Sequence, residues 1–408
     1  MGKEFTVRAV RCDHTATDQE VLERVQAVTA PLTRSWAELE HARQILIKVN
    51  MAMPVENIHY FVGRRRELVD DAVFRAVLRL LRERTSARIV VADGMSRTPQ
   101  EPLASLNYRS ILDEFGVEWV NASEPPLQLY EVPGGGNMFA RYLLTSAIAD
   151  SDAVVSIAKL KNHVFQGVTL TLKNFFGWPP MSPHGRTRRY YHHIIRLSHV
   201  LPDLGLIAKP CLNLVDGLVG QARREWNGEG RICNVLLAGD HPIATDACGM
   251  TLMGFDPHSD WPHQPFLRDR SAIQVAASAG FGTNDLDRID FQSEVSAPVA
   301  EFATAEIDQP GTVRSWRETT CEQALYYRDH QQELVGRYAH EFVMLQDNEV
   351  IWHGPDASDL PSRRLLSGQA TSSAIFLKLA DPDEVEGEHF EVYERELAAL
   401  KFARTNTG

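Results

Sequence analysis

The sequence has few cysteines, and none of them lie close together. The five cysteines contain no C-x-x-C pair; they are Cys12, Cys211, Cys233, Cys248 and Cys321. Zinc sites and cysteine-ligated iron–sulfur clusters ordinarily use such local spacing, so no cysteine-ligated iron–sulfur cluster is expected. A sparse, odd-numbered set is typical of a reducing compartment, where cysteines serve as small buried apolar residues.

Long apolar runs and an excess of positive charge are also lacking. No stretch of about 18 apolar residues occurs, and the first residues contain no apolar signal core. The formal net charge of -12 disfavours a general nucleic-acid binder and a protein that binds anionic membranes. We therefore expect a cytoplasmic protein that has neither nucleic acid nor membrane as a partner.

Two familiar ligand motifs are missing as well. The sequence contains no H-E-x-x-H zinc motif. Residues 133–136 are rich in glycine but lack the preceding strand and the G-x-G-x-x-G spacing of a dinucleotide loop, so a turn explains them better. Spacing specifies no metal and no cofactor, and a divalent metal or a nickel cofactor stays an open alternative.

The order of apolar patterns predicts an α/β fold. Residues 44–50 and 88–94 have strand patterns, and residues 67–84 between them have a strong amphipathic helical pattern. This order implies a parallel pair with a right-handed crossover. We predict a mostly parallel open sheet with flanking helices and a small C-terminal α/β appendage. We expect three parts: the core at 1–292 (one or two lobes), a helical connector at 293–340 and the appendage at 341–408.

Further elements are predicted along the chain. Strands are expected at residues 5–10, 117–120, 153–157, 211–217, 233–239, 289–291 and 374–379, with a hairpin at 342–352. Helices are expected at residues 18–39 (two, interrupted at Pro31), 101–115, 138–149, 191–207 (interrupted at Pro202), 240–253 and 262–279. Asp240 suits the N-cap of the helix that begins there, and Pro242 suits its first turn.

Residues 156–178 mix lysines, threonines and a histidine with apolar residues. In an extended segment, Lys159, Lys161 and His163 lie two apart and share one face, and residues 169, 171 and 173 repeat that spacing. Two such arms predict side chains aimed into a cleft, where desolvated lysines have lowered pKa values suited to acid–base chemistry. The alternative is that these lysines only form structural ion pairs with aspartates.

Polar residues also follow three apolar strands. Asn50 ends one strand, and Asp93 and Asp216, each followed by glycine, end two others. Ligands of open α/β sheets bind at the carboxyl ends of the strands, so we expect these side chains to meet the lysine-rich stretch at one edge. An Asp-Gly pair after a strand is also an ordinary turn, which is the competing interpretation of each alone.

Histidine, arginine and tyrosine gather after this stretch. On a helix, the rings of His192 and His193 would point about 100° apart, so only one of them is expected to act. The basic run at residues 186–189 is either an anion anchor or a solvated loop. The catalytic candidates are His163, Lys173, His192 and His193. The substrate-binding candidates are Lys159, Lys161, Thr169, Asn174, Trp178, Arg189, Tyr190 and Tyr191. The candidates that orient bases or bind a cation are Asn50, Asp93, Asp216, Asp240 and Asp246.

Several of these motifs resemble the family called domain of unknown function 362. The resemblance spans about residues 43–290 and rests on residues 48–50, 149–163, 168–177, 213–217 and 238–247. It implies the fold more than an activity, because the family has no general activity. Members often carry a ferredoxin-type iron–sulfur module, for which this chain lacks the cysteines.

A more remote likeness is to the nickel-pincer lactate racemase family. Ala149-Asp150 and the following strand, then His163, Lys173 and His192 or His193, stand in the same order here. The likeness implies His163 and one of His192 and His193 as acid–base groups, with Lys173 as a substrate or cofactor anchor.

Three hypotheses about function follow. The first is an isomerase, racemase or lyase that moves protons on a small anionic or aromatic-bearing substrate, with a homo-oligomer left open. The second is a non-catalytic accessory protein that binds a metal or redox cofactor. The third, which rests on the aromatic residues, is a cyclase-like tailoring enzyme of secondary metabolism that acts on a polycyclic or terpenoid substrate.

Overall fold

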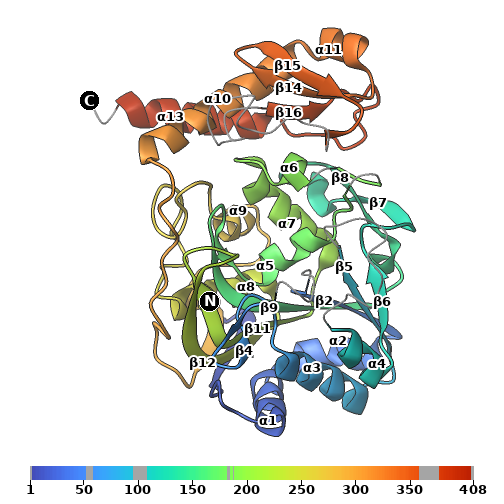
Figure 1. Ribbon diagram of the computed structural model, residues 1–408, viewed down its shortest axis with the longest axis vertical. Helices are drawn as coiled ribbons and strands as arrows, with labels where there is room; N and C mark the ends of the chain where they lie inside the picture. Colours follow the sequence, from blue (N-terminus) through green and yellow to red (C-terminus); the bar gives the residue numbers. More distant parts are fainter. Residues whose placement is uncertain are drawn as a thin grey trace.

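The computed structural model describes residues 2–51, 58–94, 108–181, 184–186, 188–357 and 376–405. The side chains of residues 188, 189 and 403–405 are outside this description, as are the predicted helix start at 101–107 and strand start at 374–375. Figure 1 shows a large sheet with helices on both sides and a smaller sheet near the C-terminus. Among the described residues, no helix is both long and apolar enough to span a bilayer.

The large sheet is mostly parallel, as predicted. Its strand order is β13-β1-β12-β11-β9-β2-β5-β6, and β10 pairs with β9 alone. β9 runs parallel to β2 and β11, β5 runs parallel to β2 and β6, and β13 runs parallel to β1, whereas β12 and β10 are antiparallel to their neighbours. The strands are β1 (Phe5–Arg11), β2 (Gln44–Val49), β5 (Arg88–Asp93), β6 (Glu118–Asn121), β9 (Ala153–His163), β10 (Gly167–Thr169), β11 (Leu212–Ala222), β12 (Glu229–Gly239) and β13 (Ile289–Ser293).

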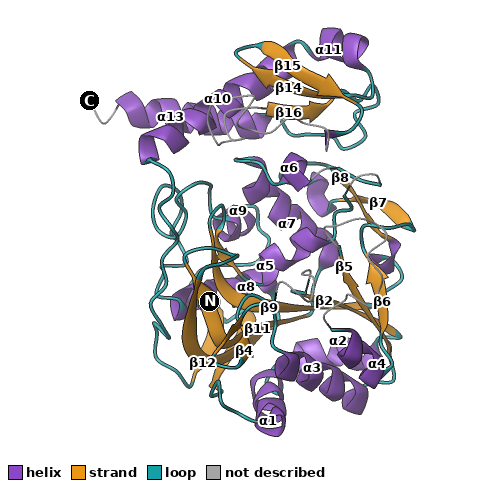
Figure 2. Cartoon of the chain, viewed as in Figure 1, coloured by secondary structure: helices purple, strands orange, loops and turns teal. Residues whose placement is uncertain are grey.

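Helices cover both faces of this sheet, which explains its near-continuous apolar strands. In β2, Ile45 and Ile47 belong to one buried cluster and Leu46 to the other, because successive side chains point to opposite faces. The first face is covered by α1 (Asp18–Thr29), α2 (Thr33–His41), α3 (Asp71–Arg84) and α4 (Arg109–Phe115). The second is covered by α5 (Thr171–Asn174), α7 (Arg196–Ala208), α8 (Pro242–Leu252) and α9 (Ala272–Ser278). Figure 2 shows these two layers as purple helices about the orange sheet.

The helix predicted at residues 138–149 is wrong. The chain there forms β8 (Arg141–Thr145), which pairs with β7 (Leu127–Glu131), followed by the single 3₁₀ turn Ser146–Ile148. Tyr142 and Leu144 are buried while Arg141 and Leu143 are partly exposed. This alternation has the strand period of two, which short apolar runs do not separate from a helical pattern. Two short strands, β3 (Tyr60–Phe61) and β4 (Arg64–Arg65), pair elsewhere.

Several predicted helix starts are also wrong. The helix expected at 191–207 begins only at Arg196, so His192 and His193 lie before it and not on one helix as predicted. The helix expected at 67–84 begins at Asp71. The helix expected at 262–279 begins only at Ala272, where Ser271 accepts a hydrogen bond from the Gln274 amide; Pro262 and Pro265 precede it and disfavour an earlier helix. The N-cap of α8 is His241 rather than Asp240. Asp240 instead accepts a hydrogen bond from the Thr6 amide and pairs with Arg34 at 3.1 Å.

The C-terminal unit contains a second sheet of strand order β15-β14-β16. The predicted hairpin is confirmed, and its turn residues Asp347 and Asn348 have φ values of 51° and 62°, as a tight hairpin turn requires. The elements are α10 (Pro310–Asp329), α11 (Gln331–Tyr338), β14 (Phe342–Gln346), β15 (Glu349–Gly354), β16 (Phe376–Leu379) and α13 (Glu391–Thr405). The boundaries 1–292, 293–340 and 341–408 stay a prediction.

Buried ion pairs join the two units. Arg196 of α7 pairs with Glu388 at 2.8 Å, and Arg317 of α10 pairs with Asp269 at 2.8 Å; all four side chains are inaccessible to solvent. Removing one partner of a buried ion pair destabilises the fold strongly, because the other charge is then buried without a partner. The C-terminal unit therefore packs on the core through specific contacts near α7.

Candidate functional site

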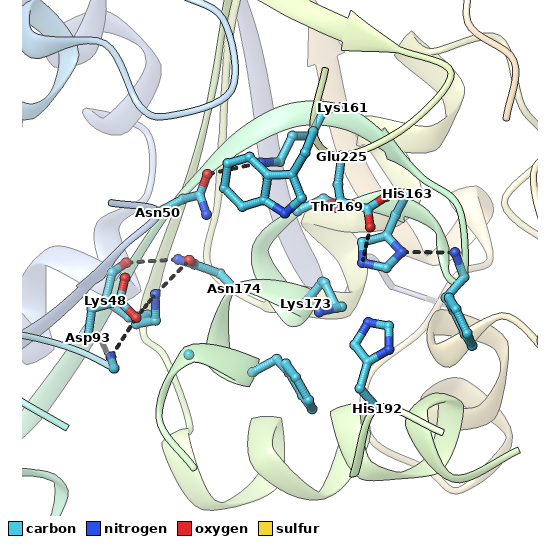
Figure 3. A pocket seen from close by; sticks show the side chains of 15 residues that line it. Lys48, Asn50, Asp93, Lys161, His163, Thr169, Lys173, Asn174, His192 and Glu225 are labelled. Carbon is cyan, nitrogen blue, oxygen red and sulfur yellow. Dashed lines mark hydrogen bonds and ion pairs between the residues drawn. The ribbon is translucent and has the colours of Figure 1, made fainter. Parts of the chain in front are cut away.

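A cavity of about 420 Å³ opens at the carboxyl ends of β2, β5 and β9. Figure 3 shows lysine, histidine, asparagine and acidic side chains reaching it from several elements. Its polar lining consists of Lys48, Asn50, Asp93, Lys161, His163, Thr169, Lys173, Asn174, His192 and Glu225. Its apolar lining includes Phe165, Phe176 and Trp226. The carboxyl edge of the sheet thus brings ten polar side chains together around one cavity.

Asn174 fixes the floor of the cavity. Its Nδ2 donates to the Lys48 carbonyl at 2.9 Å and the Ile157 carbonyl at 3.1 Å, and its Oδ1 accepts from Lys48 Nζ at 3.1 Å. One side chain therefore connects α5 with both β2 and β9. This arrangement makes Asn174 a positioning residue for the lysines around it.

Asp246 of α8 binds the first residues of α5 through hydrogen bonds. It accepts hydrogen bonds from the backbone amides of Thr171 at 2.8 Å and Leu172 at 2.9 Å, and from the Thr171 hydroxyl. Burial raises the pKa of Asp246 to about 7, although these hydrogen bonds oppose the shift. Asp246 does not line the cavity, so its contribution to the site is to position the turn that carries Lys173.

Lys48 and Asp93 form a buried ion pair at one end of the cavity. Lys48 Nζ lies 3.0 Å from Asp93 Oδ1, and each side chain is 2% exposed. Burial raises the pKa of Asp93, opposed by the charge of Lys48. A Cβ on Gly177 would lie 2.2 Å from Asp93 Oδ1, so only glycine allows the backbone after α5 to approach this pair.

Lys161 lines the cavity beside Asn50. Its Nζ donates to the Glu67 carbonyl at 2.7 Å and to Asn50 Oδ1 at 3.3 Å, and lies 4.5 Å from the ring centre of Trp226. Burial lowers the pKa of Lys161 to about 8, although Glu67 and Glu225 oppose the shift. The amine therefore gains or loses its proton near physiological pH.

Two imidazoles face the cavity. The ring centres of His163 and His192 are 5.5 Å apart, and His163 Nδ1 accepts hydrogen bonds from the amides of Phe165 at 3.0 Å and Gln166 at 3.2 Å. Because Nδ1 is an acceptor, the neutral ring carries its proton on Nε2, which lies 3.8 Å from Glu225 Oε1. Figure 3 shows the two rings on one side of the pocket.

Lys173 and Thr169 complete the polar surface. Lys173 Nζ lies 4.2 Å from the ring centre of Phe176. The buried hydroxyl of Thr169 has no hydrogen-bond partner among the described residues. The two do not belong to one extended arm: Thr169 ends β10, whereas Thr171 begins α5, so the predicted strand spacing of residues 169, 171 and 173 is wrong.

The structure places several candidates outside the cavity. Lys159 and Asp216 form a fully buried ion pair at 2.9 Å, which is the structural alternative named for the lysines. The buried His193 ring lies against the Ile194 carbonyl, and Trp178 donates to the Ala92 carbonyl. The other candidates outside the cavity are Tyr190, Tyr191, Asp240 and Asp246. The side chain of Arg189 is outside the described part.

Lys48, Glu225 and Trp226 line the cavity but were not among the candidates. Lys48 had a signal, because it stands in the Lys-Val-Asn segment at the end of β2. Glu225 and Trp226 follow β11 in the connection to β12, and no local pattern marks them; only the fold brings this connection over the cavity. Among the described residues, no group of three or more His, Cys, Asp or Glu side chains is arranged to hold a metal ion.

The comparison with known families shows to which family the chain belongs. The sequence pattern of the family described as "Domain of unknown function (DUF362)" matches residues 45–251, which is just over half of the chain. The chain belongs to the DUF362 family. The DUF362 segment extends from β2 to α8 and contains every polar residue that lines the cavity.

One curated relative of this DUF362 protein is the thylakoid-associated protein sll1697 of Synechocystis sp. (strain ATCC 27184 / PCC 6803 / Kazusa). It is 25% identical over 158 residues, which make up 35% of this chain and 48% of the relative. The match thus spans about half of the length of that relative.

A solved structure is also similar to part of the chain. The lactate racemase apoprotein from Thermoanaerobacterium thermosaccharolyticum aligns with a TM-score of 0.34 and 13% identity, covering 60% of this chain and 55% of the racemase. Similarity at this level supports no inference about shared chemistry.

Proposed function

We propose that this protein is an enzyme that moves a proton on a small anionic substrate, in a reaction of the isomerase or lyase type. The observation that carries the proposal is the pair of imidazoles, His163 and His192, facing one cavity with ring centres 5.5 Å apart. The substrate would lie beside both rings. Two histidines within reach of one ligand allow one ring to take a proton while the other stabilises the charge that develops.

The surroundings of the two rings differ, and so do their proposed roles. The two backbone amides at Nδ1 of His163 leave an Nε2–H on its other side. Such a neutral ring suits a hydrogen-bond donor to a developing negative oxygen. His192 lies against the edges or faces of Phe165 and Phe176 and is the proposed general base. Glu225, near Nε2 of His163, would orient that ring.

The lysines favour a substrate with a negative charge. Lys48, Lys161 and Lys173 line the same cavity, and the carboxylates among the lining residues are Asp93 and Glu225. Asp93 is paired with Lys48, so two lysines, Lys161 and Lys173, line the cavity beside one further carboxylate, Glu225. Positive charge in a site with little water binds an anion and also stabilises an enolate-like intermediate.

Deuterium uptake tests the proposal. The purified full chain is incubated in D₂O with an extract of small metabolic acids, and mass spectrometry follows deuterium on carbon. We expect the wild type to label at least one acid, His192→Ala to reduce the rate by about 10²-fold or more, and the exposed His41→Ala to leave it unchanged. Labelling of no acid by the wild type, or equal labelling by His192→Ala, would contradict the proposal. The accessory-protein and tailoring-enzyme alternatives stay predictions.

A further inference from the structure

A second, apolar cavity lies near the first. It has a volume of about 300 Å³, and its apolar lining consists of Leu129, Leu143, Pro180, Tyr191 and Val385. The rest of its lining is His184, Gly185, Arg186 and Glu386. Leu129 and Leu143 are directly paired across the β7–β8 hairpin. Leu129 is 41% exposed and Val385 37% exposed, so two large apolar side chains face solvent at this one place. Apolar side chains that line a cavity provide a surface to which an apolar group of a ligand can bind.

The C-terminal unit forms one wall of this apolar cavity. The Arg141 amide donates to the Glu386 carbonyl at 3.0 Å, and the Ala140 amide to the Gly387 carbonyl at 2.9 Å. These hydrogen bonds hold residues 385–387 against the hairpin. Figure 1 shows β7 and β8 directly below the C-terminal sheet.

A narrow space lies between the two cavities. It has a volume of about 20 Å³ and shares Phe176 and Gly177 with the polar cavity, and Arg186 and Tyr191 with the apolar one. A space of about this size holds about one water molecule or one methylene group. Arg186 and Tyr191 both bond to Glu386 at its far end. The three spaces therefore adjoin one another through shared lining residues, from the cavity of the histidines to the apolar one.

We propose that the substrate is an elongated amphiphile, with an acidic head beside His163 and Lys173 and an apolar tail in the cavity between Leu129 and Val385. This inference rests on the proposed function for the identity of the head site. The lysines provide charge for the head, and the leucines, Pro180 and Val385 provide an apolar surface for the tail. The polar cavity alone would not discriminate between a short acid and a long one.

Binding of straight-chain acids tests the tail site. Isothermal titration calorimetry with the full chain compares butanoate with decanoate, because each buried methylene strengthens binding by up to about fourfold. We expect decanoate to bind at least about tenfold more tightly than butanoate. Leu129→Asn should weaken decanoate binding by about fivefold. Ile351→Asn should have no effect, because Ile351 is an apolar residue of similar exposure that lies on β15, away from this cavity.

Decylamine is the control for the head, because it has the same tail and the opposite charge. It should bind at least about tenfold more weakly than decanoate. Equal binding of decanoate and butanoate, no measurable binding of decanoate, or equal binding of decylamine would each overturn the inference. Deuterium uptake is measured in a separate experiment. Deuterium uptake without a chain-length effect on binding would contradict only the tail site. A chain-length effect on binding without deuterium uptake would contradict only the proposed reaction.

Discussion

Lys159 and Lys161 lie two residues apart on β9, and their side chains nevertheless have different surroundings. Lys159 is in register with Asp216 of β11 and pairs with it. Beyond Asp216 the register of β11 shifts, and Lys161 is left to reach Asn50, Trp226 and the cavity. Spacing within one strand predicts which residues share a face. Which of these lysines forms an ion pair depends on the residues of the neighbouring strand. The lysine-rich face was therefore predictable, and the division between the two lysines was not.

The pKa of Lys161 leads to a prediction about anion binding. Since this pKa is about 8, the amine is charged below pH 8 and loses its charge as the pH rises through that value. Butanoate should therefore bind about fivefold more weakly at pH 9.5 than at pH 7. Lys161→Arg keeps its charge over this range and should remove most of the dependence, whereas the exposed Lys401→Arg should not. A pH dependence that is unchanged in Lys161→Arg would show that another group is responsible.

The short helix α5 shows how far the sequence predicts an element. The apolar strand at 153–157 was expected, but β9 extends to His163 and the chain returns as β10 before α5 begins. What ends the extended conformation is Asp246, 75 residues further along, because it accepts hydrogen bonds from the first amides of α5. A long-range contact of this kind leaves no local pattern. The same reason explains why Glu225 and Trp226 were missed.

Asp246 leads to a prediction about the anchoring of α5. Its pKa is about 7 in the folded protein and 3.8 in an unperturbed carboxyl, so its contribution to stability is fully present below pH 3.8 and is lost as the pH rises through 7. We compare the free energy of unfolding of the wild type with that of Asp246→Asn. The wild-type value minus the variant value should fall by up to about 4 kcal/mol from pH 4 to pH 8. Urea unfolding at both pH values measures it.

The control for this experiment is Asp113→Asn, which alters an exposed carboxylate on α4. The difference in free energy of unfolding between Asp113→Asn and the wild type should be nearly the same at the two pH values, because an exposed ion pair contributes little to stability. If Asp246→Asn behaved in the same way, the carboxyl of Asp246 would not be the group that titrates near neutral pH.

At the scale of the whole molecule, the core and the C-terminal unit depend on charges that are removed from water. Arg317 of α10 pairs with Asp269 of the core and with Glu396 of α13, and its side chain is inaccessible. Arg317→Met leaves two buried carboxylates without their partner and should lower the free energy of unfolding by about 3–5 kcal/mol. Arg328→Met on the same helix breaks exposed pairs and should cost about 1 kcal/mol or less.

Thermal and urea unfolding of the two variants provide the measurement. Equal effects of Arg317→Met and Arg328→Met would mean that the buried pairs do not stabilise the packing of the two units. The sequence predicted a small α/β appendage from its hairpin pattern, but it did not predict this attachment, because the paired residues lie 48 and 79 positions apart.

The amide of Asn174 has a consequence for the order of folding. It bonds at the same time to the backbone of β2 and to the backbone of β9, whose paired residues are more than 100 positions apart in the chain. Such pairing closes a long loop and is slow to form. Asn174 can take its native position only after β2 and β9 have paired in the correct register. We therefore expect the floor of the cavity to be among the last parts of the core to become ordered, so that ligand binding reports on completed folding.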